Sequence, residues 1–476
     1  MSGSLNRVFK VVFNAVRSAW VAVSECTRSS GKQKSVSRRS RHIALVAVMA
    51  SSATIAAPPV GINAPRAAIA APPAAIAAPP AVTAAPPAVN QLPTNGNVSA
   101  GQATLSTVGS TMTINQTSSK VAINWGSFDI GANAIVDFIQ PGSSAVALNR
   151  VNSSNPSQIY GQLNANGQVY LLNPAGVYFA PGANVNVGGL VATTHQMGDA
   201  DLMNGGSTFE RNGANGSVVN DGSIRTGIGG YIALLAPEVR NSGILFARQG
   251  TIALAGGEAI TLNFGPLSKL ESLTVTPSQL ATLVENRQAI QAPDGQVILS
   301  ARAANQLAGS VINSGSIEAN GVRQDGGRIV LEASSSISQT GSLSANAAAN
   351  STGNGGSVSL IADLSNPNSS TTINGSLSAR AGDLGGHGGS VETSGTQVQI
   401  GDATRIDTRA PNGNAGTWLI DPTDFTISSG GAAQTSSGMG ASTLQTALGS
   451  GNVSITTSAA ANGSDLGDIH VNANLS

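Results

Sequence analysis

Few residues of this sequence combine the types and spacing that catalysis or metal binding requires. Its 476 residues include four histidines, at His42, His195, His387 and His470. The sequence has no nucleophile elbow, phosphate-binding glycine loop, HExxH zinc motif or EF-hand loop. Asp421 and Asp424 could contribute to a cation site, but the pattern Asp-Pro-x-Asp favours a turn. We therefore expect no catalytic residue, no bound metal and no cofactor.

The strongest enzyme alternative is a polysaccharide lyase. Such enzymes need Asp, Lys and Arg clustered on one face to bind calcium and abstract a proton. Here the charges are sparse and isolated, as at Arg225, Arg240 and Arg328. His387 lies in the run GGHGGS, which lacks the Asp of a calcium-binding nonapeptide and favours a solvated turn. The sequence predicts a protein that is not an enzyme.

One short motif has both a structural and a functional interpretation, namely Asn173-Pro174-Ala175-Gly176-Val177. Proline presets φ and glycine accepts a positive φ, so Asn-Pro-x-Gly predicts a turn. The turn alone would explain these residues, and a role in recognition stays open beside it.

The amino-acid composition limits which class of protein this chain can be. Only 10% of the residues are charged and 3% are aromatic, whereas 41% are hydrophobic and 57 are glycine. Ordinary soluble domains carry about 25% charged residues. The zero net charge combines +8 in residues 1–42 with −8 in the remainder. This balance excludes a basic nucleic-acid binder and a highly charged disordered chain. No apolar run reaches the ~18 residues of a membrane helix.

Alternating apolar and small polar residues predict β-strands from Gln91 onward. After about Val218, Asn-x-Gly-Ser-Ile units such as 313–317 alternate with Gly-Gly-strand units such as 326–331. One short strand per half-unit predicts an all-β, right-handed parallel β-helix, or β-solenoid. With about 22 residues a turn, it would have up to about 17 turns and a length near 80 Å. The recurring asparagines should form stacked amide ladders.

Two segments have helical spacing instead of strand alternation. Residues 278–287 follow a proline, and residues 442–448 begin with a serine. Both predict short helices.

The first 57 residues have the pattern of a targeting segment. Nine basic residues and one acid in residues 1–42 precede the apolar run 43–50 and a small-residue stretch ending at Ala57. Residues 58–90 form an Ala/Pro-rich linker with an extended, semi-rigid conformation. The single cysteine, Cys26, precludes an internal disulfide, which suits a chain that crosses membranes unfolded.

Two parts of the chain resemble type V secreted proteins. Residues 6–34 (NRVFKVVFNAVRSAWVAVSECTRSSGKQK) resemble the extended signal peptide of these proteins. Residues 91–330 resemble the two-partner secretion (TPS) domain of filamentous haemagglutinin-like exoproteins, through INWGSFDIGANAIVDFIQP, NPSQIYGQLNANGQVYLLNPAGVYF and VNVGGLVATT. Residues 173–177 occupy the place of the family's Asn-Pro-Asn-Gly-Ile motif, with Ala175 and Val177 as departures. The resemblance implies that this motif is a secretion-motif candidate.

This resemblance implies an N-terminal TPS domain at residues 91–330 and a β-solenoid extension at 331–476 of a longer adhesin. It also implies Sec export, signal-peptidase cleavage and recognition by an outer-membrane transporter with POTRA domains. The expected product is a secreted or surface adhesin of a Gram-negative bacterium, binding a host or bacterial receptor and no nucleic acid. The alternatives are a haem- or haemoglobin-acquisition exoprotein and a contact-dependent inhibition protein without its toxin region.

Overall fold

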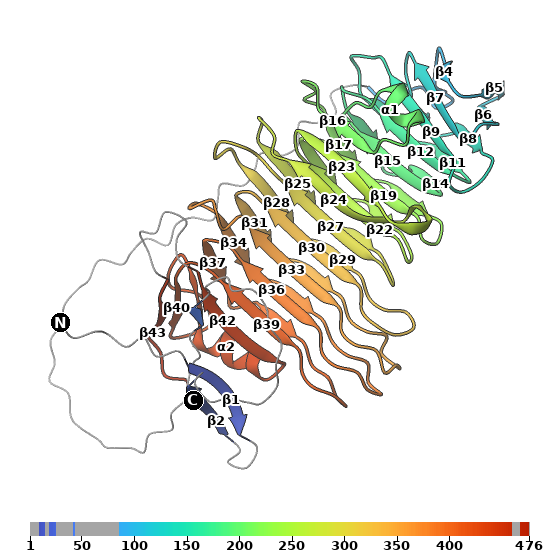
Figure 1. Cartoon of the computed structure of the whole chain (residues 1–476). Coiled ribbons are helices and arrows are strands. Elements are labelled where there is room, and N and C mark those ends of the chain that lie inside the picture. The colour runs from blue at the N-terminus through green and yellow to red at the C-terminus, as the bar shows by residue number, and fades with distance from the viewer. Residues whose placement is uncertain (1–8, 15–18, 25–40, 43–84, 459–466, 476) are drawn as a thin grey trace, which may run out of the picture.

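The computed structural model describes residues 9–14, 19–24, 41–42, 85–458 and 467–475. Most of the expected signal peptide and linker therefore lies outside the described residues. Within the described part of the chain, three long sheets wind around one axis (Figure 1). The predicted all-β parallel β-helix is confirmed. None of the helices in this part is long and apolar enough to cross a membrane.

The first sheet has fourteen strands, of which the two end strands β4 and β3 are antiparallel to their neighbours. Its strands, in spatial order, are β4 (Asn97–Ala100), β7 (Lys120–Trp125), β9 (Val146–Val151), β12 (Gln168–Leu172), β15 (Gly189–Thr193), β19 (Tyr231–Leu235), β22 (Thr251–Gly256), β27 (Gln296–Ala301), β30 (Arg328–Ala333), β33 (Ser357–Ala362), β36 (Ser390–Ser394), β39 (Thr417–Asp421), β42 (Asn452–Thr457) and β3 (Arg41–His42).

The second and third sheets have twelve strands each. The second sheet contains β5 (Ala103–Val108), β6 (Thr111–Gln116), β8 (Ile135–Ile139), β11 (Gln162–Ala165), β14 (Asn184–Val187), β18 (Ser223–Thr226), β21 (Ile244–Phe246), β26 (Ala289–Gln291), β29 (Ser316–Glu318), β32 (Ser342–Ser344), β35 (Ser376–Ser378) and β38 (Arg405–Asp407). The third sheet contains β10 (Ser157–Ile159), β13 (Val177–Phe179), β17 (Ser217–Asn220), β20 (Glu238–Asn241), β25 (Thr282–Asn286), β28 (Gly309–Asn313), β31 (Ser336–Gln339), β34 (Ser370–Ile373), β37 (Gln397–Ile400), β41 (Gly438–Gly440), β40 (Phe425–Ser428) and β43 (Ile469–Val471).

A typical coil passes through the second, first and third sheets in turn, as β11, β12 and β13 do. Without β3 and β4, the first sheet has twelve parallel strands, so the described chain forms twelve coils. The stack is then about 53 Å long at ~4.8 Å a step. The number of coils is below the predicted upper limit of about 17, because several coils use more than the assumed 22 residues. Val146 lies opposite Gln168 in an early coil, whereas the later pair Ser357 and Ser390 is separated by a longer stretch of sequence.

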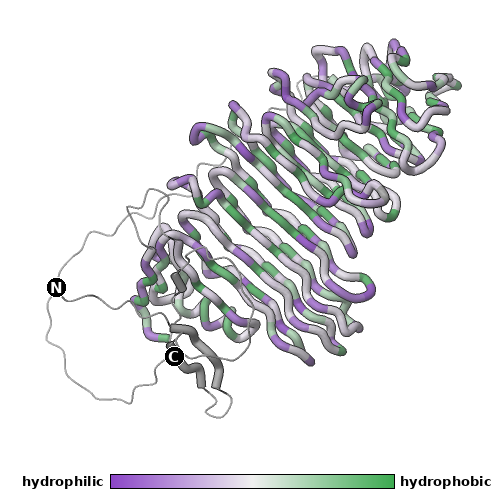
Figure 2. Tube along the Cα trace, in the orientation of Figure 1, coloured by the Kyte–Doolittle hydropathy of each residue, from purple (hydrophilic) through white to green (hydrophobic). Residues whose placement is uncertain are grey.

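The interior of the coils is filled by columns of aliphatic side chains. In the first sheet, one column continues through Ile252, Val297, Ile329 and Val358, all fully buried. The next residues along these strands, such as Ala253, Ile298 and Val330, are also apolar and buried, and Figure 2 shows hydrophobic colour along the strands of the stack. Burying each such side chain stabilises the fold by about 1.5–3 kcal/mol. This narrow interior accounts for the scarcity of aromatic residues.

The predicted asparagine ladder lies at the ends of the third-sheet strands. Each side-chain amide donates to the next one along the axis. The donor–acceptor distances are 2.7 Å from Asn220 to Asn241, 2.8 Å from Asn241 to Asn286, 2.7 Å from Asn286 to Asn313 and 2.9 Å from Asn313 to Gln339. All five side chains are fully buried. The ladder is confirmed, and it supplies the hydrogen bonds that buried amides require.

One of the two predicted helices forms. Helix α2 (Ala441–Leu448) packs Leu444 and Ala447 into the core. The helix expected at residues 278–287 is wrong, because strand β25 occupies residues 282–286. β25 pairs with β20 on one side and β28 on the other, so sheet stacking overrides the local helical spacing.

Candidate secretion site

The motif Asn173–Val177 joins strand β12 of the first sheet to β13 of the third. The backbone N–H of Gly176 donates to the carbonyl of Asn173 at 2.9 Å, which closes a four-residue turn. The side-chain oxygen of Asn173 accepts from the N–H of Ala175 at 3.0 Å. Gly176 has a φ of +128°, which favours glycine. The predicted turn is therefore present.

The motif is built into the wall of the coil. Asn173 is fully buried, and its amide donates to the carbonyl of Asn155 and to the hydroxyl of Ser157, both at 3.0 Å. Gly176 and Val177 are buried, and only Pro174 and Ala175 are partly exposed. The turn thus links two adjacent coils, and it leaves two small side chains for contact with another molecule.

A second layer covers the outer face of the first sheet. It consists of α1 (Asp199–Met203), β16 (Thr208–Glu210), β23 (Ala259–Phe264), η1 (Pro266–Ser268) and β24 (Leu270–Thr276). We call these elements the covering layer. They carry Phe209, Ile260 and Leu262 into a second apolar cluster with Leu148 and Tyr170 of the first sheet. The cluster attaches the layer to the coils from β7 to β22.

Polar contacts fasten the covering layer at several points. His195 is fully buried, and its Nε2 lies 3.0 Å from the carbonyl of Gly257. Because a carbonyl only accepts, Nε2 carries a hydrogen and donates it in this contact. Burial, above all, lowers the pKa of His195 to about 4. Arg211 forms a salt bridge of 2.9 Å with Glu258. These contacts join the segment before α1 and the residue after β16 to the β22–β23 connection.

Two further ion contacts tie α1 to the first coils. Arg150 forms a 2.8 Å salt bridge with Asp199, at the start of α1. Lys120 Nζ donates to the carbonyl of Leu202 at 2.9 Å. These two contacts therefore attach α1 to strands β9 and β7.

The end of the β-helix is closed by antiparallel strands. β5 pairs with β6, and β4 pairs with β7, so the first coil does not present an open parallel edge. Trp125 is buried there, donates to Asn149 Oδ1 at 3.0 Å and packs against Phe128 at 5.3 Å between ring centroids. Val89, at the end of the expected linker, accepts through its carbonyl from the N–H of Asn133 at 2.7 Å.

The covering layer was not predicted from the sequence, although two sequence features indicate it. Leu190 lies opposite Val169 in the preceding coil and opposite Ile232 in the following one, and its separation from Ile232 along the sequence is twice its separation from Val169. Such a doubling indicates an insertion between coils. The alternating segments AITLNF and LESLTVT around GPLS have the pattern of a hairpin.

The other sequence candidates lie apart from this site. Asp421 Oδ1 accepts from Ser458 at 3.2 Å, and Asp424 Oδ1 accepts from the N–H of Asp468 at 2.8 Å. His387 Nδ1 accepts from the N–H of Asn414 at 3.1 Å. Among the described residues, no group of three or more His, Cys, Asp or Glu could hold a metal ion. The β30 strand crosses the domain boundary expected between residues 330 and 331.

Two known proteins are similar in sequence to part of this chain. The chain is 36% identical to the heme/hemopexin-binding protein of Haemophilus influenzae (strain ATCC 51907 / DSM 11121 / KW20 / Rd) over 249 residues, which are 51% of this chain and 27% of that protein. It is 34% identical to a second Haemophilus influenzae heme/hemopexin-binding protein over 244 residues, 47% of this chain and 26% of that protein. The chain thus spans about a quarter of the length of these relatives.

The crystal structure of the HMW1 secretion domain from Haemophilus influenzae shares the fold. It superposes with a TM-score of 0.62 at 24% sequence identity, covering 73% of this chain and 93% of that one. The family model of the TPS secretion domain matches residues 88–345, more than half of the chain. The model of the Extended Signal Peptide of Type V secretion system matches residues 6–54. The predicted resemblance is confirmed, and the chain belongs to the TPS secretion domain family, as an exoprotein that a Gram-negative bacterium exports by two-partner secretion.

Proposed function

We propose that the exported chain is a surface adhesin without enzymatic activity, released through a cognate outer-membrane transporter. The observation that carries this proposal is the stack of twelve continuous coils, which presents long regular sheet faces to a binding partner. Parallel strands in adjacent coils pair residue by residue, as β27 and β30 do. A stack of this kind holds a binding surface rigidly away from the cell, as adhesion requires.

The charged side chains support a non-enzymatic role. Catalytic acids and bases act at a shared pocket, where they face a substrate. Here several pair with each other in structural contacts, such as Arg240 with Glu238 at 2.6 Å and Arg211 with Glu258 at 2.9 Å. Arg240 is buried and also contacts Glu285 on the neighbouring strand. These charges stabilise the third sheet and the covering layer.

The proposal is tested by expressing the chain with its transporter in a non-adherent Gram-negative strain. We expect the chain to reach the cell surface and to raise adherence to cultured epithelial cells at least about tenfold over the transporter alone. A chain lacking residues 91–330 should stay inside the cell and give no adherence. Full surface display without increased adherence would exclude the adhesin function, while secretion of the deleted chain would exclude the role of this domain.

A second candidate, binding of haem or of the haem carrier hemopexin, is favoured by the names of the two relatives. The aligned region is about half of this chain, which is longer than the stretch on either side of residues 88–345, so it overlaps the secretion domain. The test is surface plasmon resonance of the purified secreted chain with hemopexin, together with absorbance titration with haem. Saturable binding of either would support this candidate over adhesion to cells, and a flat response to both would exclude it.

A further inference from the structure

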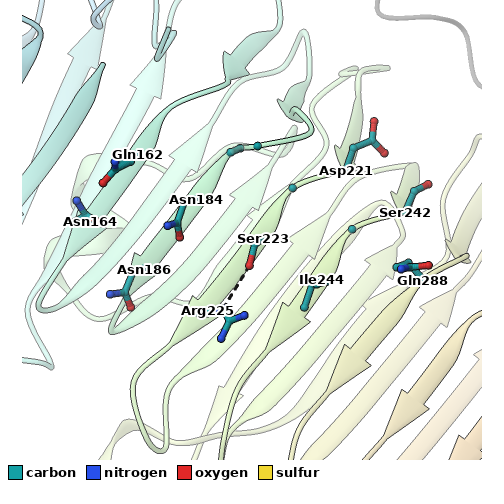
Figure 3. A pocket seen from close by; sticks show the side chains of 14 residues that line it. Gln162, Asn164, Asn184, Asn186, Asp221, Ser223, Arg225, Ser242, Ile244 and Gln288 are labelled. Carbon is teal, nitrogen blue, oxygen red and sulfur yellow. Dashed lines mark hydrogen bonds between the residues drawn. The ribbon is translucent and has the colours of Figure 1, made fainter. Parts of the chain in front are cut away.

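An open groove with a volume of about 870 Å³ lies on the outer face of the second sheet. Its lining includes Gln162 of β11, Asn184 and Asn186 of β14, Arg225 of β18 and Ile244 of β21. Figure 3 shows these side chains standing on successive strands. We call this surface the amide groove. The four strands are direct neighbours, so the groove crosses about 14 Å along the axis of the β-helix.

The amides of this groove differ from those of the buried ladder. Asn241 and Asn286 use their side-chain amides to bond each other and their neighbours. By contrast, Gln162, Asn184 and Asn186 are exposed and have no side-chain hydrogen bond to another described residue, whereas Asn164 beside them donates to Asp137 Oδ1 at 2.8 Å. Each exposed amide therefore keeps two donors and one carbonyl acceptor available. A periodic row of such groups matches a ligand with both donors and acceptors at repeated positions.

The charge of the groove argues for a neutral ligand. Its lining has one carboxylate, Asp221, and one guanidinium, Arg225. Asp221 accepts from the hydroxyl of Tyr178 at 3.0 Å, and Arg225 lies 5.8 Å from the ring centre of Phe246. Nucleic acids and sulfated polymers depend on many cationic contacts, which this surface does not offer. An added peptide strand needs a free sheet edge, whereas the four strands here are paired on both sides.

The groove also has apolar surface beside the amides. Ile244 is 37% exposed, and Phe246 on the same strand is half-buried under Arg225. Sugar rings combine hydroxyl groups, which donate and accept hydrogen bonds, with C–H faces that pack on apolar side chains. A linear glycan repeats both features at every sugar. We propose that the amide groove binds a neutral linear polysaccharide, with Asn184 and Asn186 as its central hydrogen-bonding residues.

The shape of the groove sets the expected length dependence. It is open along the axis and extends over four strands, so a single sugar would fill only a part of it. A hexasaccharide can contact the amides of β11 and β14 as well as the apolar side chains of β21. We therefore expect affinity to rise with chain length. This inference holds whether the chain binds cells or hemopexin, because it concerns the outer face of the secretion domain itself.

The experiment is isothermal titration of the secreted chain with cellohexaose, maltohexaose and chitohexaose, and with the disaccharide of each. We expect at least one hexasaccharide to bind, its disaccharide to bind about tenfold more weakly or less, and the affinity to be unchanged between 50 and 500 mM NaCl. The variant Asn184→Ala/Asn186→Ala should weaken binding about tenfold, since it removes two hydrogen-bonding groups.

The matched control is Asn350→Ala/Asn368→Ala, which removes two exposed asparagine amides outside the groove. It should leave the affinity unchanged. Both variants should keep the circular dichroism spectrum and unfolding temperature of the parent. The proposal is overturned by any of three results: none of the three hexasaccharides binds, both double variants bind equally, or only heparin binds and does so in a salt-dependent manner.

Discussion

The side-chain amide of Asn241 donates to the amide oxygen of Asn286 across 2.8 Å, although the two residues are 45 positions apart in the sequence. They lie at the ends of β20 and β25, which pair directly in the third sheet. Asn241 also accepts from Asn220 at 2.7 Å. A single side chain thus joins three coils.

Replacing Asn241 with alanine should be strongly destabilising. It leaves the buried Asn220 donor and the buried Asn286 acceptor without these partners, and each unsatisfied group costs about 1–3 kcal/mol. We expect native-state hydrogen exchange to show strands β17, β20 and β25 opening at a free energy lower by about 2–5 kcal/mol. The exposed control Asn350→Ala should change it by less than about 0.5 kcal/mol. Equal protection in both variants would contradict a stabilising ladder.

The turn at residues 173–177 gives a prediction that separates folding from recognition. Asn173→Ala removes the amide that bonds Asn155 and Ser157, which should cost about 1–3 kcal/mol and reduce secretion through misfolding. Pro174→Ala changes a partly exposed side chain and should leave secretion near the parental level. Secretion is measured by quantitative blotting of culture supernatants with the transporter present. A stable Pro174→Ala chain that is retained in the cell would instead show that the transporter recognises this side chain.

The buried His195 predicts acid sensitivity. Its pKa is about 4 in the folded chain, against about 6.5 when unfolded, so between these values the unfolded state binds more protons. Stability from the neutral ring is complete above pH 6.5 and decreases as the pH falls toward 4, by up to roughly 3 kcal/mol. Urea unfolding monitored at pH 7, 6, 5 and 4 measures this slope.

The variant His195→Gln keeps a donor for the carbonyl of Gly257 and does not titrate. Its stability should therefore change less between pH 7 and 4 than that of the parent. Exposed His387 provides the matched control, since His387→Gln should keep the parental slope. Parallel pH curves for the parent and His195→Gln would refute the assignment.

Phe209 anchors the covering layer. It is fully buried in the second cluster and packs against Tyr170 at 5.8 Å between ring centroids. Phe209→Ala should cost about 3–5 kcal/mol through the cavity that it leaves. We expect hydrogen exchange to accelerate in β16, β23 and β24, while β30 and β33 keep their protection. Glu210→Ala, an exposed change on the same strand, is the control, and uniform loss of protection along the whole stack would contradict a separable layer.

The repeated parts of this molecule could be predicted from the sequence. The Gly-Gly units precede first-sheet strands such as β30, and the Asn-x-Gly units end third-sheet strands such as β28. Both signals lie within a few residues of the strand that they predict. Each coil then determines the position of the next one, so no long-range information is needed. The covering layer is different, since its stability comes from packing Phe209 and Ile260 onto an outer sheet face. Such long-range packing leaves little trace in the spacing of residues along the chain.

The wrong prediction of a helix at residues 278–287 also results from long-range packing. Its local spacing favours a helix, yet Val284 is fully buried between Val239 and Val311 of the neighbouring strands. The site was also only partly predictable. The turn at Gly176 follows from Pro and Gly in the sequence, whereas the burial of Asn173 depends on Asn155 and on Ser157 at the start of β10 in the preceding coil.

The amide ladder has a direction. In every step from Asn220 to Gln339, the donor belongs to the earlier coil and the acceptor to the later one. The ladder ends at the Nε2 of Gln339, which is buried and has no hydrogen-bond partner among the described residues. In a chain that folds coil by coil from its N-terminal end, the last coil to form therefore carries a side-chain amide whose donor is still unbonded. The next asparagine accepts from that donor and in turn supplies a new unbonded donor for the coil after it.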